Sequence, residues 1–255
     1  MSTGLSGAAR AIEELTLNAW PPLETLLFDG WILSFSNRYT RRANSVHPLY
    51  PSTLPLLDKI ATCEAVYAAR DYPETVFKIT SALEDATLDR ALAARGYARI
   101  ALTSVQTAAL DRLPAAADAG VVISSSLTER WFADFNRLAA TPEPLQASER
   151  RLLEKIGVPH AFGSVSVDGQ SVALGLAVHE RGHVGLFDVV VDGRHRKRGL
   201  ARRLCAALLA WGHAAGADTA YLAVMADNTA ALQLYAGLGF HEVYRYWYRF
   251  SAVSQ

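Results

Sequence analysis

The chain has 255 residues, 25 acidic and 25 basic side chains, and 51% hydrophobic residues. This length suits one large or two small domains, and the composition excludes a disordered or collagen-like chain. The longest apolar run, residues 205–211, is far shorter than the roughly 20 residues of a transmembrane helix. The N-terminus also lacks a secretory signal pattern, so we expect a cytoplasmic protein with no membrane contact.

The N-terminal half alternates helix and strand signals. The clearest is a run of apolar residues every three or four positions from Leu56 to Tyr67, which predicts one packed helix face. Pro21 and Pro22 end the first predicted helix, because the residue before a proline leaves the helical region. In chain order we expect a helix, a two-stranded hairpin, a helix, a strand, a helix and a strand, over residues 8–19, 30–36 with 40–49, 52–70, 74–80, 83–95 and 97–110.

A segment rich in Pro, Ala and Gly, residues 111–120, is the predicted linker between two domains, 1–112 and 113–255. After it the signals alternate again. We expect a strand, two helices, a three-stranded meander, a helix, a strand, a helix and a strand, over residues 121–125, 128–139, 147–156, 161–167, 171–178, 184–191, 199–215, 219–225, 228–238 and 241–250.

This order predicts an α/β fold of two similar halves, each with a mixed, mostly antiparallel sheet flanked by helices. The halves repeat the same succession of elements at a nearly constant offset. Gly96 and Gly239 lie 143 residues apart, and Val46 and Val191 lie 145 apart. A repeated order at constant offset predicts a duplicated pair of domains, although α/β units also resemble one another by chance.

The segment richest in chemistry is residues 186–201, LFDVVVDGRHRKRGLA. A β run leads through a basic turn with Gly199 into a helix, whose first N–H groups and dipole favour an anion. The glycine spacing differs from both the P-loop and the dinucleotide fingerprint. Bound phosphates explain the basic run better than nucleic acid does, because the chain is neutral overall and no aromatic residues interleave there.

Two motifs in the C-terminal half resemble the GNAT superfamily of acetyl-CoA-dependent N-acetyltransferases. One is Arg196-x-x-Gly199-x-Ala201, and the other is Asn228-x-x-Ala231-x-x-x-Tyr235-x-x-x-Gly239-Phe240. The resemblance covers roughly residues 121–250. The N-terminal half is similar to the degenerate half of tandem GNAT proteins, because residues 47–52 lack the Arg-x-x-Gly turn. The resemblance therefore implies one coenzyme site, in the C-terminal half.

The family pattern implies roles for particular residues. Tyr235 would protonate the coenzyme A thiolate, and the alternative is a core tyrosine. Asn228 would bind the pantetheine arm, cap a helix, or do both. The residues implied to contact acetyl-CoA are Val189, Val190, Val191, Arg196, Lys197, Arg198, Gly199, Leu200, Ala201, Asn228 and Tyr235.

The general base is less clear from the sequence. Asp188 is a carboxylate inside an apolar strand next to the coenzyme segment, where burial would raise its pKa. The alternative is a structural aspartate bonded to backbone. Together with Glu180 and Glu143, Asp188 is predicted to bind a cationic acceptor.

We therefore expect acetyl transfer to a primary amine by direct attack in a ternary complex, without a metal. The acceptor is expected to be a small molecule, because tandem proteins of this kind resemble aminoglycoside acetyltransferases, including the kasugamycin 2′-N-acetyltransferase type, which confer antibiotic resistance. A protein N-terminus or lysine, or a non-catalytic acyl-CoA-binding module, are the alternatives. A monomer or homodimer is expected, with Cys63 and Cys205 as core thiols.

Overall fold

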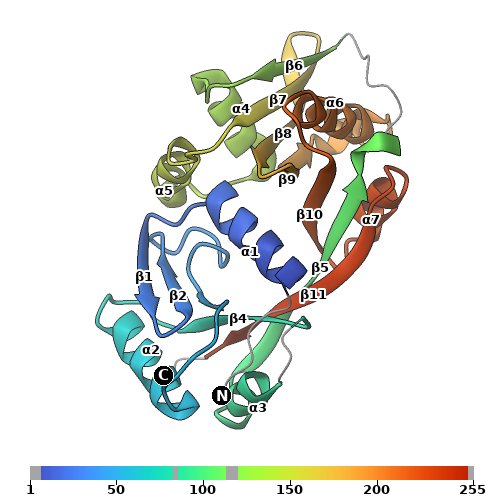
Figure 1. Cartoon of the computed structure of the whole chain (residues 1–255). Helices are drawn as coiled ribbons and strands as arrows, with labels where there is room; N and C mark the ends of the chain where they lie inside the picture. The colour runs from blue at the N-terminus through green and yellow to red at the C-terminus, as the bar shows by residue number, and fades with distance from the viewer. Residues whose placement is uncertain (1–6, 83–85, 113–119, 252–255) are drawn as a thin grey trace. The chain divides into compact units, whose positions relative to one another are not determined.

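The computed structural model describes residues 7–82, 86–112 and 120–251 (Figure 1). The chain divides into two compact units. Unit 1 holds residues up to 104 and from 244 onward, and unit 2 holds residues 105–243. The linker predicted at residues 111–120 falls largely on residues 113–119, outside the described part of the chain. The predicted domains 1–112 and 113–255 stay a prediction.

Unit 1 contains a mixed sheet in the order β1-β2-β3-β4-β11. The pair β3–β4 is parallel, and the pairs β1–β2, β2–β3 and β4–β11 are antiparallel. Figure 1 shows the red strand β11 beside β4. The elements are α1 (Gly7–Ala19), β1 (Glu24–Phe28), β2 (Trp31–Phe35), β3 (Val46–Pro48), α2 (Leu56–Ala68), β4 (Val76–Thr80), α3 (Thr87–Ala94), the first part of β5 (Ala98–Ala109) and most of β11 (His241–Phe250).

The two faces of this sheet differ in polarity. One face packs an apolar cluster against α2, and it includes Leu33 and Phe77. Because side chains alternate along a strand, their neighbours Ser34 and Lys78 lie on the opposite face. There the Lys78 ammonium pairs with the Glu13 carboxylate of α1, and both side chains are buried. A buried ion pair therefore joins helix α1 to this face of the sheet.

The antiparallel pairing predicted between residues 30–36 and 40–49 is confirmed in part, because β2 pairs with β3 from Trp31 with Pro48 to Leu33 with Val46. A second hairpin, which was not predicted, joins β1 to β2. Strand β1 pairs with β2 up to Phe28 and Trp31, so the loop is Asp29-Gly30. Both loop residues have positive φ, +41° and +81°, as two-residue hairpin turns require. The sequence signal for β1 is weak because this edge strand is mostly exposed and lacks alternation.

Residues 37–45 form a loop instead of a strand. The Asn44 side chain bonds main-chain groups of this loop that a strand pair would otherwise satisfy. Its Oδ1 accepts from the Ser36 amide at 2.6 Å, and its Nδ2 donates to the Tyr39 carbonyl at 2.8 Å. Strand structure resumes only at β3.

Unit 2 contains a mixed sheet in the order β5-β10-β9-β8-β7-β6. The pair β9–β10 is parallel, whereas β6–β7, β7–β8 and β8–β9 are antiparallel. Besides the end of β5, the elements are β6 (Val121–Ser124), α4 (Glu129–Ala139), α5 (Glu143–Glu154), β7 (His160–Val167), β8 (Gln170–Glu180), β9 (His183–Val191), the 3-10 turn η2 (Gly193–His195), α6 (Leu200–Ala214), β10 (Thr219–Met225) and α7 (Thr229–Ala236).

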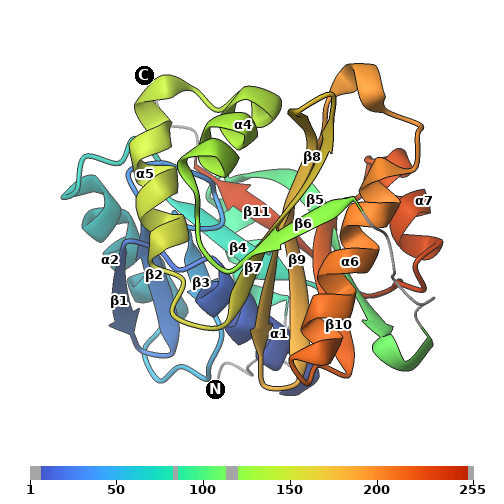
Figure 2. The same ribbon diagram turned by 90° about the horizontal axis from the view of Figure 1, so that it is seen from above.

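Helices α4 and α6 cover opposite faces of this sheet (Figure 2). A Cβ on Gly163 of β7 would lie 2.7 Å from Leu204 of α6, so the glycine lets this helix approach closely. Its neighbour Phe162 points the other way, and its ring lies 4.9 Å from that of Trp131 in α4. The larger apolar core of unit 2 therefore lies between this sheet and α6.

The predicted α/β class is confirmed, and the helices and strands of unit 2 fall within two residues of their predicted bounds, with one exception. Helix α5 begins at Glu143 rather than at residue 147, because Pro144 is tolerated in a first helical turn. Both cysteines are buried, as predicted, and burial raises the pKa of each thiol to about 12. Among the described residues, none of the helices has the length and apolar character needed to cross a membrane.

Candidate active site

The parallel strands β9 and β10 separate near the middle of β9. Their pairing runs from His183 with Thr219 to Leu186 with Leu222. Strand β9 then continues to Val191, and its other edge stays paired with β8. The edge of residues 189–191 that faces away from β8 therefore presents main-chain groups to which an extended ligand can add hydrogen bonds.

A β-bulge at Asp188 marks this separation. Phe187 pairs with Leu176 and Val190 with Leu174, so Asp188 and Val189 together lie opposite Gly175. Asp188 has φ +51°, which aspartate tolerates better than most residues. It is half-buried, with Oδ2 shielded from solvent. Bulges of this kind re-aim side chains and are common beside active sites.

The bulge shifts by one residue the alternation of side chains between the two faces of β9. Before it, Val184 and Leu186 belong to the core under α6, and after it Val189 and Val191 pack against that core. One extra residue therefore keeps the apolar side chains of both halves of β9 on the same face. The predicted coenzyme-binding valines are core side chains, and their main chains form the open edge.

Asp192 anchors the turn that follows β9. Its Oδ1 accepts from the Arg194 amide at 2.9 Å, and its Oδ2 lies 3.1 Å from the Arg194 guanidinium. Arg137 of α4 donates to the Ser171 carbonyl at 2.9 Å and approaches Asp192 at 4.0 Å. The hydrogen bonds from Arg194 lower the pKa of Asp192 to about 2. Asp192 is therefore ionised at every physiological pH.

The basic turn leads directly into the first turn of α6. Arg196, Lys197 and Arg198 are exposed, and Gly199 caps the helix with φ +75°. Among the described residues, no side chain caps this end, and a Cβ built on Gly199 meets no atom within 4 Å. The positive φ therefore accounts for the glycine, and the space before the first-turn N–H groups is open. Such an end, with three cations beside it, suits a phosphate.

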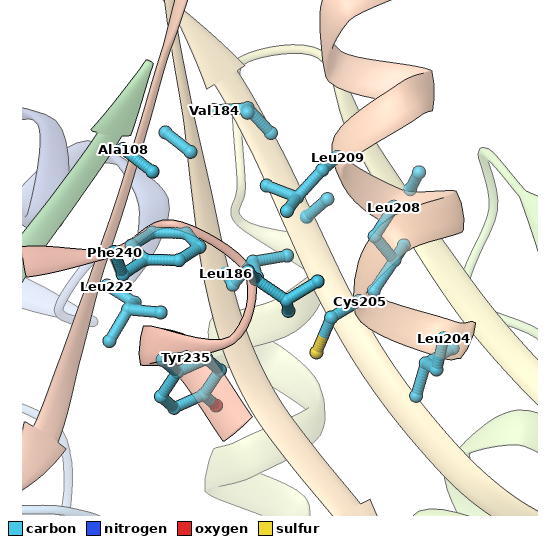
Figure 3. Close-up of a cluster of buried hydrophobic side chains, with 14 of the residues drawn as sticks. Ala108, Val184, Leu186, Leu204, Cys205, Leu208, Leu209, Leu222, Tyr235 and Phe240 are labelled. Atoms are coloured by element: carbon cyan, nitrogen blue, oxygen red, sulfur yellow. The ribbon is translucent and has the colours of Figure 1, made fainter. Parts of the chain in front are cut away.

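Helix α7 carries the other two predicted residues. Asn228 is exposed and accepts from the Ala231 amide at 3.1 Å, so it is a helix N-cap. Tyr235 is 8% exposed and belongs to the core under α6, with its ring 5.8 Å from Phe240 (Figure 3). Burial, with a smaller contribution from Cys205, raises the pKa of Tyr235 above its usual value. The phenol is therefore protonated at neutral pH and can donate.

The three predicted acidic residues lie in different places. Glu180 pairs with His183 at the start of β9, and Asp188 is five residues further along, which corresponds to about 16 Å of strand. Glu143 is the exposed first residue of α5. Asp188 alone of the three lies in the strand segment that leads into the basic turn before α6.

The sequence analysis missed two residues that support this site. Asp192 precedes a glycine and a basic run, and this Asp-Gly turn signal could have identified it. Arg202 of α6 donates to the Gly237 carbonyl at the end of α7, at 3.0 Å. Nothing local in the sequence indicates that bond, because it joins residues 35 positions apart.

The fold that carries the separating strands, the bulge and the basic turn before α6 is shared by solved acetyltransferases of the GNAT family. The chain belongs to the family described as "Probable histone acetyltransferase Rv0428c C-terminal", which it matches over residues 6–249. The resemblance inferred from the two motifs is thereby confirmed.

Relatives and solved structures agree with this family. The uncharacterized N-acetyltransferase YobR of Bacillus subtilis is 25% identical over 94% of this chain and 97% of its own. The [ribosomal protein bS18]-alanine N-acetyltransferase of Escherichia coli is 30% identical over 95 residues, 37% of this chain and 64% of that one.

Two solved structures share the fold. A GCN5-related N-acetyltransferase from Kribbella flavida superposes with a TM-score of 0.69 at 16% identity, over 95% of each chain. A tandem GNAT protein from the clavulanic acid biosynthesis pathway gives 0.65 at 16% identity, over 96% of this chain and 88% of that one.

Proposed function

We propose that unit 2 binds acetyl-CoA between the open edge of β9 and the first turn of α6. The observation that carries this proposal is the open space before Gly199, next to Arg196, Lys197 and Arg198. The pyrophosphate would accept hydrogen bonds from the first-turn N–H groups of Leu200 and Ala201. The pantetheine arm would pair with the main chain of residues 189–191, as a short added strand.

The side chains supply the proton transfers. Acetyl-CoA provides the thioester, and an acceptor amine forms a new N–C bond as the C–S bond breaks. Asp188 binds the acceptor ammonium and takes one proton, which leaves the neutral amine that attacks. As the C–S bond breaks, Tyr235 donates a proton to the departing sulfur, and the second proton that the acylated nitrogen releases restores the phenol. Asn228, besides capping α7, lies six residues after Leu222, the last residue of β10 paired with β9, and would contact the pantetheine arm.

We propose a small cationic amine, such as an aminoglycoside of the kasugamycin type, as the acceptor. A carboxylate in the Asp188 bulge supports this choice, because an ammonium pairs with a carboxylate that is partly shielded from water. A protein α-amine is the second candidate, and the similarity to the bS18-alanine enzyme favours it.

Two glycines at opposite ends of α6 provide a matched test of the coenzyme site. Gly199 and Gly216 both have positive φ, +75° and +99°, and a Cβ on either meets no described atom within 4 Å. Aspartate therefore imposes similar backbone strain at both positions. We expect Gly199→Asp to abolish acetyl-CoA binding in calorimetry, because the carboxylate repels the pyrophosphate, and Gly216→Asp to retain it. Equal binding by the two variants would contradict the proposed site.

The acceptor is tested by thiol release from acetyl-CoA against aminoglycosides including kasugamycin, polyamines, amino acids and short peptides. Release with an amino sugar supports the small-molecule proposal. Release confined to peptides overturns it in favour of a protein acceptor. Asp188→Asn should then raise KM for the accepted amine while leaving KM for acetyl-CoA unchanged.

A further inference from the structure

Helix α7 is short, and its packing is confined to one face. Of its eight residues, all in the described part of the chain, Tyr235 is buried, and Ala231, Leu232 and Leu234 are partly buried against the same core. A helix of this length is unstable in isolation. Its position, and with it the position of the Tyr235 phenol, therefore depends on this packing together with the contacts at its two ends.

Each end of α7 has a side-chain partner. Asn228 caps the first turn, as described above. At the other end, NH1 of Arg202 donates to the Gly237 carbonyl at 3.0 Å. The last carbonyls of a helix lack intrahelical donors and carry the negative end of its dipole, so a guanidinium is well matched to this position.

Gly237 is fitted to this contact. Its backbone is right-handed, with φ −67° and ψ −13°, so the chain path there does not require glycine. A Cβ at this position would lie 3.1 Å from NH1 of Arg202, closer than ordinary contact. The missing side chain therefore leaves room for the guanidinium.

The backbone of Arg202 lies in the helix turn where the coenzyme is proposed to bind. It lies three residues after Gly199, in the first turn of α6, where the Arg203 amide makes its bond to the Gly199 carbonyl at 3.1 Å. Figures 1 and 2 both show α6 and α7 as neighbours. One residue thus has its backbone in the proposed phosphate-binding turn and its side chain on the helix of Tyr235.

We propose that Arg202 is a positioning residue that couples the coenzyme-binding turn to Tyr235. It holds α7 so that the phenol meets the departing sulfur of a coenzyme seated on α6. This inference rests on the proposed function. A different role, direct binding of a coenzyme phosphate by the Arg202 side chain, predicts a different kinetic effect.

The first test separates these roles by steady-state kinetics. Arg202→Gln should lower kcat about three- to tenfold, as expected for loss of a charged hydrogen bond, and leave KM for acetyl-CoA within about twofold. Arg202→Lys retains a charged donor and should restore part of kcat. Arg151→Gln, at an exposed arginine of α5, is the control and should match the wild type. A raised KM with unchanged kcat overturns the inference, because it assigns Arg202 to the phosphate.

The second test asks whether Arg202 acts through Tyr235. Adding Arg202→Gln to Tyr235→Phe should lower kcat no further, because the acid that Arg202 positions is already absent. A full additional loss would overturn the inference. If Tyr235→Phe itself leaves kcat unchanged, the proposed acid is wrong and the inference falls with it. If Tyr235→Phe lowers kcat and Arg202→Gln does not, the inference alone fails.

Discussion

Asp192 holds Arg194 at two points, with one carboxylate oxygen on the backbone amide at 2.9 Å and the other 3.1 Å from the guanidinium. This ion pair stabilises the turn between β9 and the basic run. It therefore fixes the position from which Arg196, Lys197 and Arg198 follow. We expect Asp192→Asn to raise KM for acetyl-CoA about two- to fivefold, the effect of losing an exposed ion pair.

The same pair predicts a pH-independent effect. Because the pKa of Asp192 is about 2, its carboxylate stays charged throughout the working range of an enzyme. The ratio of mutant to wild-type KM should therefore stay constant between pH 5.5 and 8.5. Asp168→Asn, in the exposed turn between β7 and β8, is the control and should leave KM unchanged.

Tyr235 should not limit the rate at moderately alkaline pH. Burial raises the pKa of its phenol, so the proton needed by the departing sulfur stays available beyond the usual tyrosine range near 10. We expect Tyr235→Phe to lower kcat about 100-fold, as loss of a general acid does. An alkaline loss of kcat below pH 9.5 that disappears in Tyr235→Phe would contradict the raised pKa, and an unchanged kcat in Tyr235→Phe would contradict the assignment of Tyr235 as the acid.

The buried ion pair of unit 1 should be costly to break on one side. Lys78 and Glu13 are 3% and 1% exposed, and Glu13 also accepts from the Tyr244 hydroxyl at 2.7 Å. Lys78→Met leaves a buried carboxylate without its cation and should lower the free energy of unfolding by about 3–5 kcal/mol. Urea denaturation measures this loss. The double variant Glu13→Gln/Lys78→Met should recover most of it.

Acid should weaken unit 1 through the same carboxylate. Burial raises the pKa of Glu13, but Lys78 and Tyr244 outweigh burial and hold it below its usual value. A depressed carboxyl pKa contributes stability above the unfolded pKa and loses it as the pH falls through the folded value. In the double variant, the unfolding free energy should therefore depend less on pH below 4.5 than in the wild type.

His47 should make the protein less stable at mildly acidic pH. Burial, helped by the charge of Lys78, lowers the pKa of this imidazole to about 3. The unfolded chain therefore takes up a proton below pH 6.5 that the folded chain refuses, and stability falls as the pH decreases. Between pH 6.5 and 5 the loss should be about 2 kcal/mol. His47→Gln should abolish this slope, whereas His241→Gln, at an exposed histidine, should retain it.

The sequence predicted much of unit 2 because its signals are local. Strand β10 was predicted with the bounds that the structure has, since it is a compact β run between turn residues. The anion-binding turn before α6 was also predictable, because three cations, Gly199 and the following apolar helix are contiguous. Its geometry, with positive φ and open space at Gly199, agrees with that expectation.

In unit 1, the same local reasoning found the pairing of β2 with β3 but missed the hairpin of β1 with β2. The Asp29-Gly30 signal was present, but the mostly exposed strand β1 lacks the alternation that marks a half-buried strand. Asn44 then stabilises a loop whose sequence resembles a strand. Here hydrogen bonds between residues five and eight positions apart outweigh the local preference for a strand.

The amino-acid sequence by itself determined the class of protein, most element positions and the basic turn that opens α6, because apolar periodicity, turn residues and helix ends act over a few residues. Tertiary structure alone decided the register that places the bulge at Asp188, the membership of most of β11 in unit 1 and the bond from Arg202 to Gly237. Each of these depends on which distant segments pair, and that choice is made by the packing of the whole core rather than by any local pattern.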